Sequence, residues 1–182
     1  MRGMNTYTIE QSRFAHFFTA SKASAPLWFL ARLYLGYEFL MAGWEKLGNP
    51  VWFGSNAGAA LQGFVNGALA KTVGAHPDVQ MWYATFLQNT VLPHVNGWSH
   101  AVVLGELAIG LGLIVGLFTC TAAFFAFFMS FNFMLAGTVS MNPIFVLVAL
   151  GIMSARRVAG YWGLDRYAKP YLRRTFRSRN SP

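Results

Sequence analysis

The chain is organised by four long apolar segments, which lie at about residues 26–47, 99–118, 119–137 and 142–157. At about 1.5 Å of helical rise per residue, the first two are long enough to cross a hydrocarbon core of ~30 Å. The fourth begins at Asn142–Pro143, which is a helix start signal, but it is short for a span. The pattern predicts an all-α integral membrane protein, built as a four-helix bundle in a single domain over residues 1–182.

The connections between these segments are unequal in length. Almost nothing separates the second segment from the third, so their helices are expected to be antiparallel neighbours. Residues 48–98 form a long loop with two stretches of helical spacing, which are Leu61, Phe64, Val65, Ala68 and Leu69, and then Trp82, Tyr83, Phe86 and Leu87 after the candidate cap Asp78. We expect two short amphipathic helices there, on the outer face of the membrane.

Composition and charge agree with a membrane location. Hydrophobic residues make up 55% of the chain and charged residues only 11%. The net charge of +8 comes from basic residues that flank the first and last apolar segments, while Lys71 is alone in the long loop. This positive-inside pattern predicts that both termini are cytoplasmic, in the plasma (inner) membrane of a prokaryote. The basic tail, residues 158–182, is expected to contact membrane lipid, and nucleic acid is not an expected partner.

Cysteine and histidine positions limit the redox chemistry. Cys120 is the only cysteine, so one chain has no disulfide, redox dithiol or thiolate zinc site, and redox chemistry needs a bound cofactor or a partner. Two histidines, His16 and His76, lie outside the spans, and the other two, His94 and His100, lie near the outer boundary. Neither a haem held between transmembrane histidines nor a metal site is therefore expected.

Three polar residues of different spans are expected at one depth. Along alternating helices, Glu38 lies ~18 Å above the inner end of its helix, Asn132 ~20 Å above the inner end of its own, and Glu106 ~10 Å below the outer boundary. Arg32 lies roughly two turns below this level and Lys46 roughly two turns above it. With no cation at its level, Glu106 is expected to be protonated and to donate a hydrogen bond.

This layer has two interpretations. It can hold the polar head group of a quinone, with Glu106 as the catalytic group that binds or deprotonates the quinol while Glu38 and Asn132 shape the pocket. The alternative is that the three side chains only bridge helices, as polar residues in membranes often do. Arg32 is interpreted as snorkelling or capping carbonyls near the inner boundary, and Lys46 as an interfacial residue.

Several motifs, in order, resemble one family. The sequence Arg32-x3-Gly36-x2-Phe39-x3-Gly43-x2-Lys46-Leu47 is similar to the first-helix pattern of the DoxX and DoxD membrane proteins. Further similar segments are Asn49-Pro50 with Trp52, Phe86-Leu87 with Val91-Leu92-Pro93-His94, Gly105-Glu106-Leu107 with Gly110 and Leu113, and Gly163-Leu164-Asp165. Together they cover about residues 30–165, and their shared order makes the resemblance fairly specific.

The resemblance implies a four-helix membrane bundle. It also implies a function, because the DoxD branch is the membrane subunit of thiosulfate:quinone oxidoreductase and acts with a separate subunit, DoxA. This chain departs from the family at Thr119-Cys120, where Thr-Arg is common, and so lacks the family's cation at this position of the inner side. We therefore expect a membrane subunit of a quinone-linked oxidoreductase, with a DoxA-like or other redox subunit as partner.

The competing hypothesis is a membrane scaffold without enzymatic activity, which assembles redox or stress-response proteins. A transporter is less favoured, because the sequence has no sign of two inverted halves. Whether the chain is an enzyme, which molecule donates electrons and whether several copies assemble into a homo-oligomer are left open.

Overall fold

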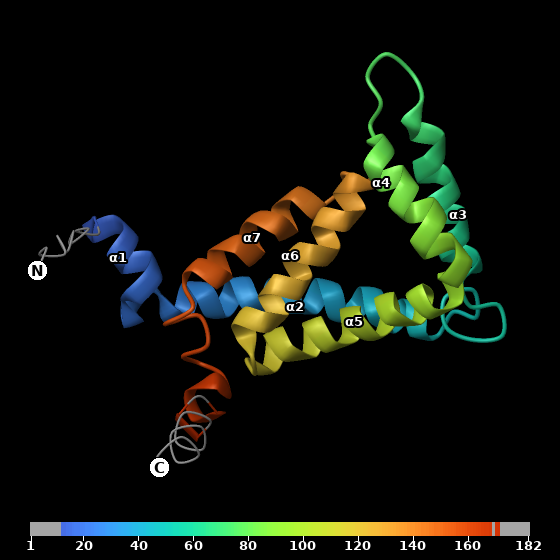
Figure 1. The fold of residues 1–182 in the computed structure, drawn as a ribbon. Helices are drawn as coiled ribbons and strands as arrows, with labels where there is room; N and C mark the ends of the chain where they lie inside the picture. The colour runs from blue at the N-terminus through green and yellow to red at the C-terminus, as the bar shows by residue number, and fades with distance from the viewer. Residues whose placement is uncertain (1–11, 169, 172–182) are drawn as a thin grey trace, which may run out of the picture.

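The computed structural model describes residues 12–168, 170 and 171, which form helices and no strands. The four longest helices cover the four apolar segments: α2 (Ala25–Leu47), α5 (Val95–Val115), α6 (Thr119–Leu135) and α7 (Asn142–Ser154) (Figure 1). The all-α prediction is confirmed. Among the described helices, one continuous stretch over Met81–Val115 is long and apolar enough to cross a membrane, and α6 and α7 are shorter apolar helices.

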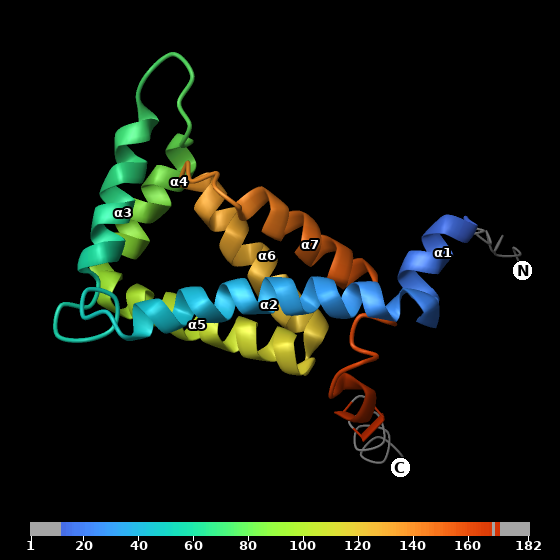
Figure 2. The same cartoon turned by 180° about the vertical axis from the view of Figure 1, so that it is seen from behind.

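The long helices form two pairs, in which α2 packs along α5 and α6 packs along α7. The two pairs diverge from the short connection between α5 and α6, so that the core has a triangular outline (Figures 1 and 2). The expected antiparallel neighbours α5 and α6 are thus in contact near their connection and separated at their far ends. The bundle is therefore splayed, and it leaves space between these two helices.

The pair of α2 and α5 is close because small residues meet at the interface. A Cβ added to Gly110 would lie 2.6 Å from the backbone nitrogen of Leu40, and one added to Gly43 would lie 2.9 Å from that of Leu107. Small residues permit this approach of two helix backbones, which maximises dispersion contacts between helices in lipid. The spaced glycines of these segments are therefore a packing surface.

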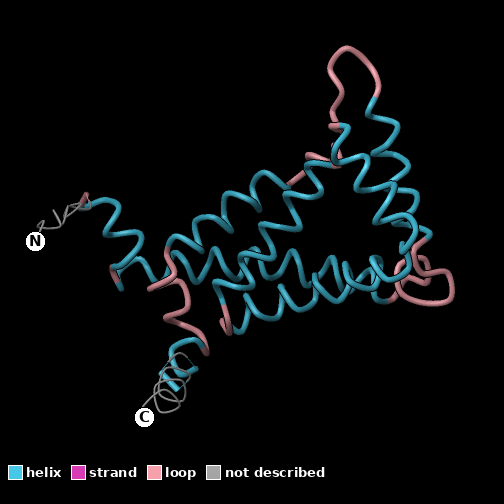
Figure 3. The backbone as a smooth tube through the Cα atoms, viewed as in Figure 1, coloured by secondary structure: helices cyan, strands magenta, loops and turns pink. Residues whose placement is uncertain are grey.

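The predicted outer helices lie across the wide end of the triangle. They are α3 (Ala59–Leu69), extended by the 3-10 helix η2 (Ala70–Thr72), and α4 (Met81–Phe86); loops flank α3 on both sides (Figure 3). The cap of α4 is Gln80, not Asp78 as predicted. From α4 the chain continues through the π-helix η3 (Leu87–Val91) and the 3-10 helix η4 (Leu92–His94) into α5 without a break.

Two polar contacts fasten this outer cap to α6. The Lys71 ammonium donates a hydrogen bond to the Gly137 carbonyl at 2.7 Å. The Tyr83 hydroxyl donates to the Asn132 carbonyl at 3.0 Å. Between them, Leu61, Val65, Val79, Leu87 and other apolar residues form a core that also includes Ala136 after α6. The outer cap, made of α3, η2 and α4, is therefore fixed over the space between α5 and α6, and we also refer to it as the roof of that space.

The helix interface generates a test. Gly110→Ala should lower the free energy of unfolding in detergent by about 2 kcal/mol, because the added methyl group meets the backbone of α2. The matched control is Gly105→Ala on the same helix, where the nearest atom is the flexible Met129 Cε at 3.6 Å. Thermal or denaturant unfolding compares the two. Equal stability of both variants would contradict the interface described here.

Candidate functional site

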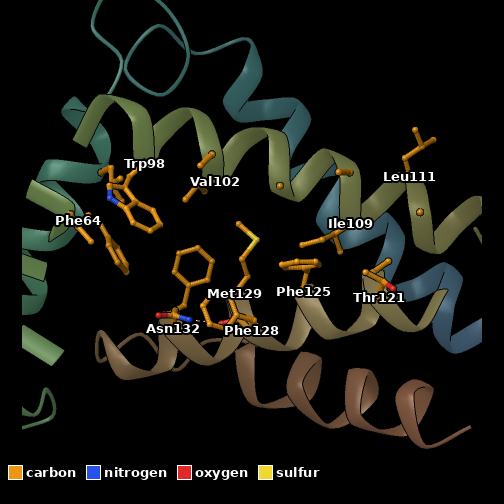
Figure 4. A pocket seen from close by; sticks show the side chains of 18 of the residues that line it. Phe64, Trp98, Val102, Ile109, Leu111, Thr121, Phe125, Phe128, Met129 and Asn132 are labelled. Carbon is orange, nitrogen blue, oxygen red and sulfur yellow. Dashed lines mark hydrogen bonds between the residues drawn. The ribbon is translucent and has the colours of Figure 1, made fainter. Parts of the chain in front are cut away.

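The space between α5 and α6 is a cavity of about 880 Å³. Figure 4 shows side chains of both helices pointing into it, among them Val102, Ile109, Phe125, Phe128 and Met129. Residues of the roof, including Phe64 from α3 and Phe86 from α4, close the wide end. Toward the narrow end the lining residue Phe125 is 50% exposed, and the cavity opens sideways there to the surroundings of the helices.

One end of the apolar cavity is polar. The Tyr83 hydroxyl lies 3.2 Å from Asn132 Oδ1 and 3.0 Å from the Asn132 carbonyl oxygen, so its single hydrogen is directed at this residue. Asn132 Nδ2 donates to the Phe128 carbonyl at 2.8 Å. A primary amide has two N–H groups and a phenol oxygen has lone pairs, so one donor and one acceptor remain for a ligand.

Glu106 has a cation beside it. The Lys46 ammonium lies 2.8 Å from both carboxylate oxygens, with 21% and 4% of the Lys46 and Glu106 side chains exposed. The prediction that no cation reaches Glu106 is therefore wrong. It compared heights of Cα atoms, whereas a lysine side chain has four methylene groups and carries its charge far from its own backbone. Glu106 is consequently one half of a buried ion pair.

A small network surrounds this pair at the outer end of α2. The Lys46 ammonium lies 5.4 Å from the centre of the Trp52 ring, which is favourable cation–π geometry. The Trp52 carbonyl in turn accepts a hydrogen bond from the buried Ser99 hydroxyl of α5 at 2.6 Å. Trp52, in the loop after α2, therefore contacts Lys46 of the ion pair through its ring and α5 through its carbonyl.

The predicted layer of three polar residues does not form. Asn132 lines the cavity, but Glu106 and Glu38 do not. Within the described part of the chain, Glu38 is half-buried and has no hydrogen bond or ion pair. Equal depth in the membrane does not mean that two side chains face each other. Successive residues of a helix are rotated by about 100° around its axis, and this rotation decides which neighbouring helix a side chain contacts. On α5, Gly105 and Ala108 face the cavity while Glu106 faces α2.

Tyr83 is the functional residue that sequence analysis missed. Its position in an amphipathic stretch was interpreted as part of an apolar face. A signal was available, because a buried tyrosine needs a partner for its hydroxyl, and here that partner is on α6. No group of three or more histidine, cysteine or acidic residues placed to hold a metal ion occurs in the described residues.

Arg32 is fully buried at the opposite end of the bundle, which the charge pattern predicts to be the inner end. Its Nη2 donates to the Trp162 carbonyl at 3.0 Å, so of the two predicted roles it has that of capping a carbonyl. A methyl group on Gly116 or Gly163 would collide with Arg32 Nη1. Nearby, the Asp165 carboxylate accepts hydrogen bonds from the backbone N–H groups of Phe118 and Thr119, at the start of α6. These residues hold the inner end together, while Arg32 Nε and Nη1 are buried without a hydrogen-bond partner among the described residues.

The ion pair generates a second test. Lys46→Met should lower the free energy of unfolding by about 3 kcal/mol, because it leaves the Glu106 carboxylate buried without a partner. Lys46→Met combined with Glu106→Leu should regain part of this loss. A double-mutant cycle measured by unfolding in detergent provides the coupling energy, with Glu38→Gln as a neutral control. Strictly additive effects would show that the two groups are not paired.

Comparison with known proteins agrees with the motifs. The model of the DoxX family matches residues 27–139, more than half of the 182-residue chain. The matched segment contains α2, the outer cap, α5 and α6, and hence the cavity and the ion pair. No curated protein and no solved structure matches the chain. The chain therefore belongs to the DoxX family of membrane proteins.

Proposed function

We propose that this protein is the membrane subunit of a quinone-linked oxidoreductase and that the cavity between α5 and α6 holds the quinone. The main support is the chemistry of this cavity. Its lining is apolar except for one hydrogen-bonded polar pair, Tyr83 and Asn132, at one end. Its volume of about 880 Å³ is within the range of sites for small organic ligands. A quinone has the matching chemistry, namely a flat ring, an apolar tail and carbonyl oxygens.

The side chains fit such a ligand. Aromatic rings of Phe64, Phe86 and Phe128 provide faces and edges against which a quinone ring packs. The remaining N–H of Asn132 suits a quinone carbonyl, and the Tyr83 oxygen suits a quinol hydroxyl. The apolar tail leaves past Phe125, where the cavity opens sideways. When bound, the quinone supplies the capacity to accept two electrons and two protons.

This proposal changes the roles of the predicted residues. Asn132 keeps its role in holding the head group, and Tyr83 joins it. We assign to Glu106 the role of a positioning residue, because its carboxylate is bound to Lys46 on the side of α5 that faces α2. Glu38 has no role in the pocket. Arg32 holds the inner end of the bundle.

The electrons that reduce the quinone must come from a group outside this chain. A single cysteine provides no redox pair within one chain, so a partner subunit with a redox group is required. The resemblance to the DoxD branch suggests thiosulfate as donor and a DoxA-like subunit as partner. The competing function is a scaffold, in which a phospholipid acyl chain fills the same cavity and the polar pair only fastens the roof.

Quinone titration distinguishes the two functions. Trp98 lines the cavity, so its fluorescence should be quenched saturably by a short-chain ubiquinone or menaquinone analogue added to the purified protein. Asn132→Leu should weaken this binding about tenfold, because one buried hydrogen bond to the ligand is lost. Glu38→Gln is the matched control and should bind as the parent does. Trp98→Phe identifies the part of the signal that comes from the cavity.

Two results would contradict the proposal. Quenching without saturation in the parent protein would favour the scaffold. Normal binding by Asn132→Leu, with a loss in Glu38→Gln, would place the head group elsewhere. Because Asn132→Leu removes contacts of the roof, Ala108→Trp serves as a second variant: it fills the cavity from α5 and should abolish the saturable signal.

A further inference from the structure

The short helix α1 (Arg13–Ala20) presents an aromatic surface without a partner in the described structure. Phe14, Phe17 and Phe18 share one of its faces, with Phe14 75% and Phe17 43% exposed. His16 and Thr19 lie on the opposite face, and Arg13 lies at the edge of the aromatic face. An aromatic face bordered by a basic residue and opposed by polar residues is typical of helices that lie in the headgroup region of a membrane.

Polar contacts near its C-terminal end join α1 to the start of α2. The indole Nε1 of Trp28, in α2, donates to the Phe18 carbonyl at 2.7 Å. The buried Ser24 hydroxyl lies 3.4 Å from the same carbonyl and 2.8 Å from that of Ser21. Figures 1 and 2 show α1 at the same end of the molecule as the C-terminal segment. The aromatic surface is therefore part of the inner end of the protein.

Two cations meet at this end around one ring. The Lys22 ammonium, beside α1, lies 5.4 Å from the centre of the Tyr161 ring, and the Arg166 guanidinium carbon lies 5.2 Å from it. Both basic side chains are exposed, and neither forms an ion pair among the described residues. Two positive charges beside one tyrosine, without a paired carboxylate, attract an anion to this end of the molecule.

The inner end has almost no negative charge of its own to fill this site. The described acidic residues are Glu38, Glu45, Asp78, Glu106 and Asp165. Of these only Asp165 lies at the inner end, and its carboxylate oxygens accept the N–H groups of Phe118 and Thr119. Exposed Arg157 adds further positive charge after α7. The basic residues Lys169, Arg173, Arg174, Arg177 and Arg179 of the predicted tail lie outside the described residues.

We propose that Lys22, Tyr161 and Arg166 bind the headgroup of an anionic phospholipid of the inner leaflet. The two cations attract the phosphate, and the aromatic face of α1 packs against the acyl chains. An anionic lipid is favoured over an acidic protein because the cations adjoin exposed aromatic side chains, including Phe14, Phe17 and Trp162. Amphipathic aromatic rings beside basic residues match the boundary between headgroups and acyl chains. This site is independent of the quinone cavity.

Lipid titration of the purified full chain tests the proposal. In mild detergent, native mass spectrometry should detect saturable binding of phosphatidylglycerol in preference to phosphatidylcholine with the same acyl chains. Lys22→Gln combined with Arg166→Gln should weaken phosphatidylglycerol binding about 30-fold, because each basic residue near an anionic headgroup contributes about fivefold. The charge-preserving pair Lys22→Arg and Arg166→Lys should bind as the parent does.

Further measurements distinguish an anionic phospholipid from a soluble phosphate compound or an acidic protein as the ligand of this site. Phe14→Ser combined with Phe17→Ser should also weaken binding, because the acyl contact is lost, while glycerol phosphate in solution should not compete at equal concentration. Equal binding of the two lipids by the parent, or unchanged binding by the Gln pair, would overturn the proposal. Full competition by glycerol phosphate would overturn it in favour of a soluble phosphate compound. Persistent capture of an acidic protein that displaces the lipid would overturn it in favour of a protein partner.

Discussion

The ion pair between Lys46 and Glu106 determines the orientation of α5, on which the rest of the structure depends. The buried Glu106 carboxylate is paired with a cation, and that cation is on α2. Glu106 therefore turns toward α2, and glycines at the same interface allow the two backbones to come close. On the opposite face of α5, Gly112 lies close to Ala122 of α6, while Gly105 and Ala108 face the space between the two diverging helices. That face becomes one wall of the cavity.

The other wall depends on the way the ends of α6 are fastened. At the inner end the Asp165 carboxylate caps α6 and holds it near the end of α5. At the outer end Lys71 and Tyr83 attach α6 to the roof formed by α3 and α4. The helix is thus kept away from α5 at one end and close to it at the other. A cavity with a roof and a sideways opening follows from these polar contacts, and not from poor packing.

The sequence predicted the helices well because their signals are local. Each signal depends only on residues that are close together in the sequence. These signals are the length of an apolar run, the start signal at Asn142–Pro143 and the helical spacing in residues 48–98. The site was predicted poorly because it depends on relations between segments. Glu106 faces α2 and not Asn132 because of the rotation of α5 about its axis. The long side chain of Lys46 reaches Glu106 from a different depth. Tyr83, which contacts Asn132, lies in a sequence pattern that indicates only an apolar helix face. None of these three relations can be derived from depth along a helix alone.

The central claim is that a quinone occupies the cavity between α5 and α6. Photocrosslinking with an azido-quinone analogue, followed by peptide mapping of the labelled protein, tests it most directly. We expect labels on residues 105–112 of α5 and 121–133 of α6, with an excess of unlabelled quinone preventing them. Labels confined to α2 near Lys46 and Glu106, or labels that unlabelled quinone does not prevent, would contradict the account.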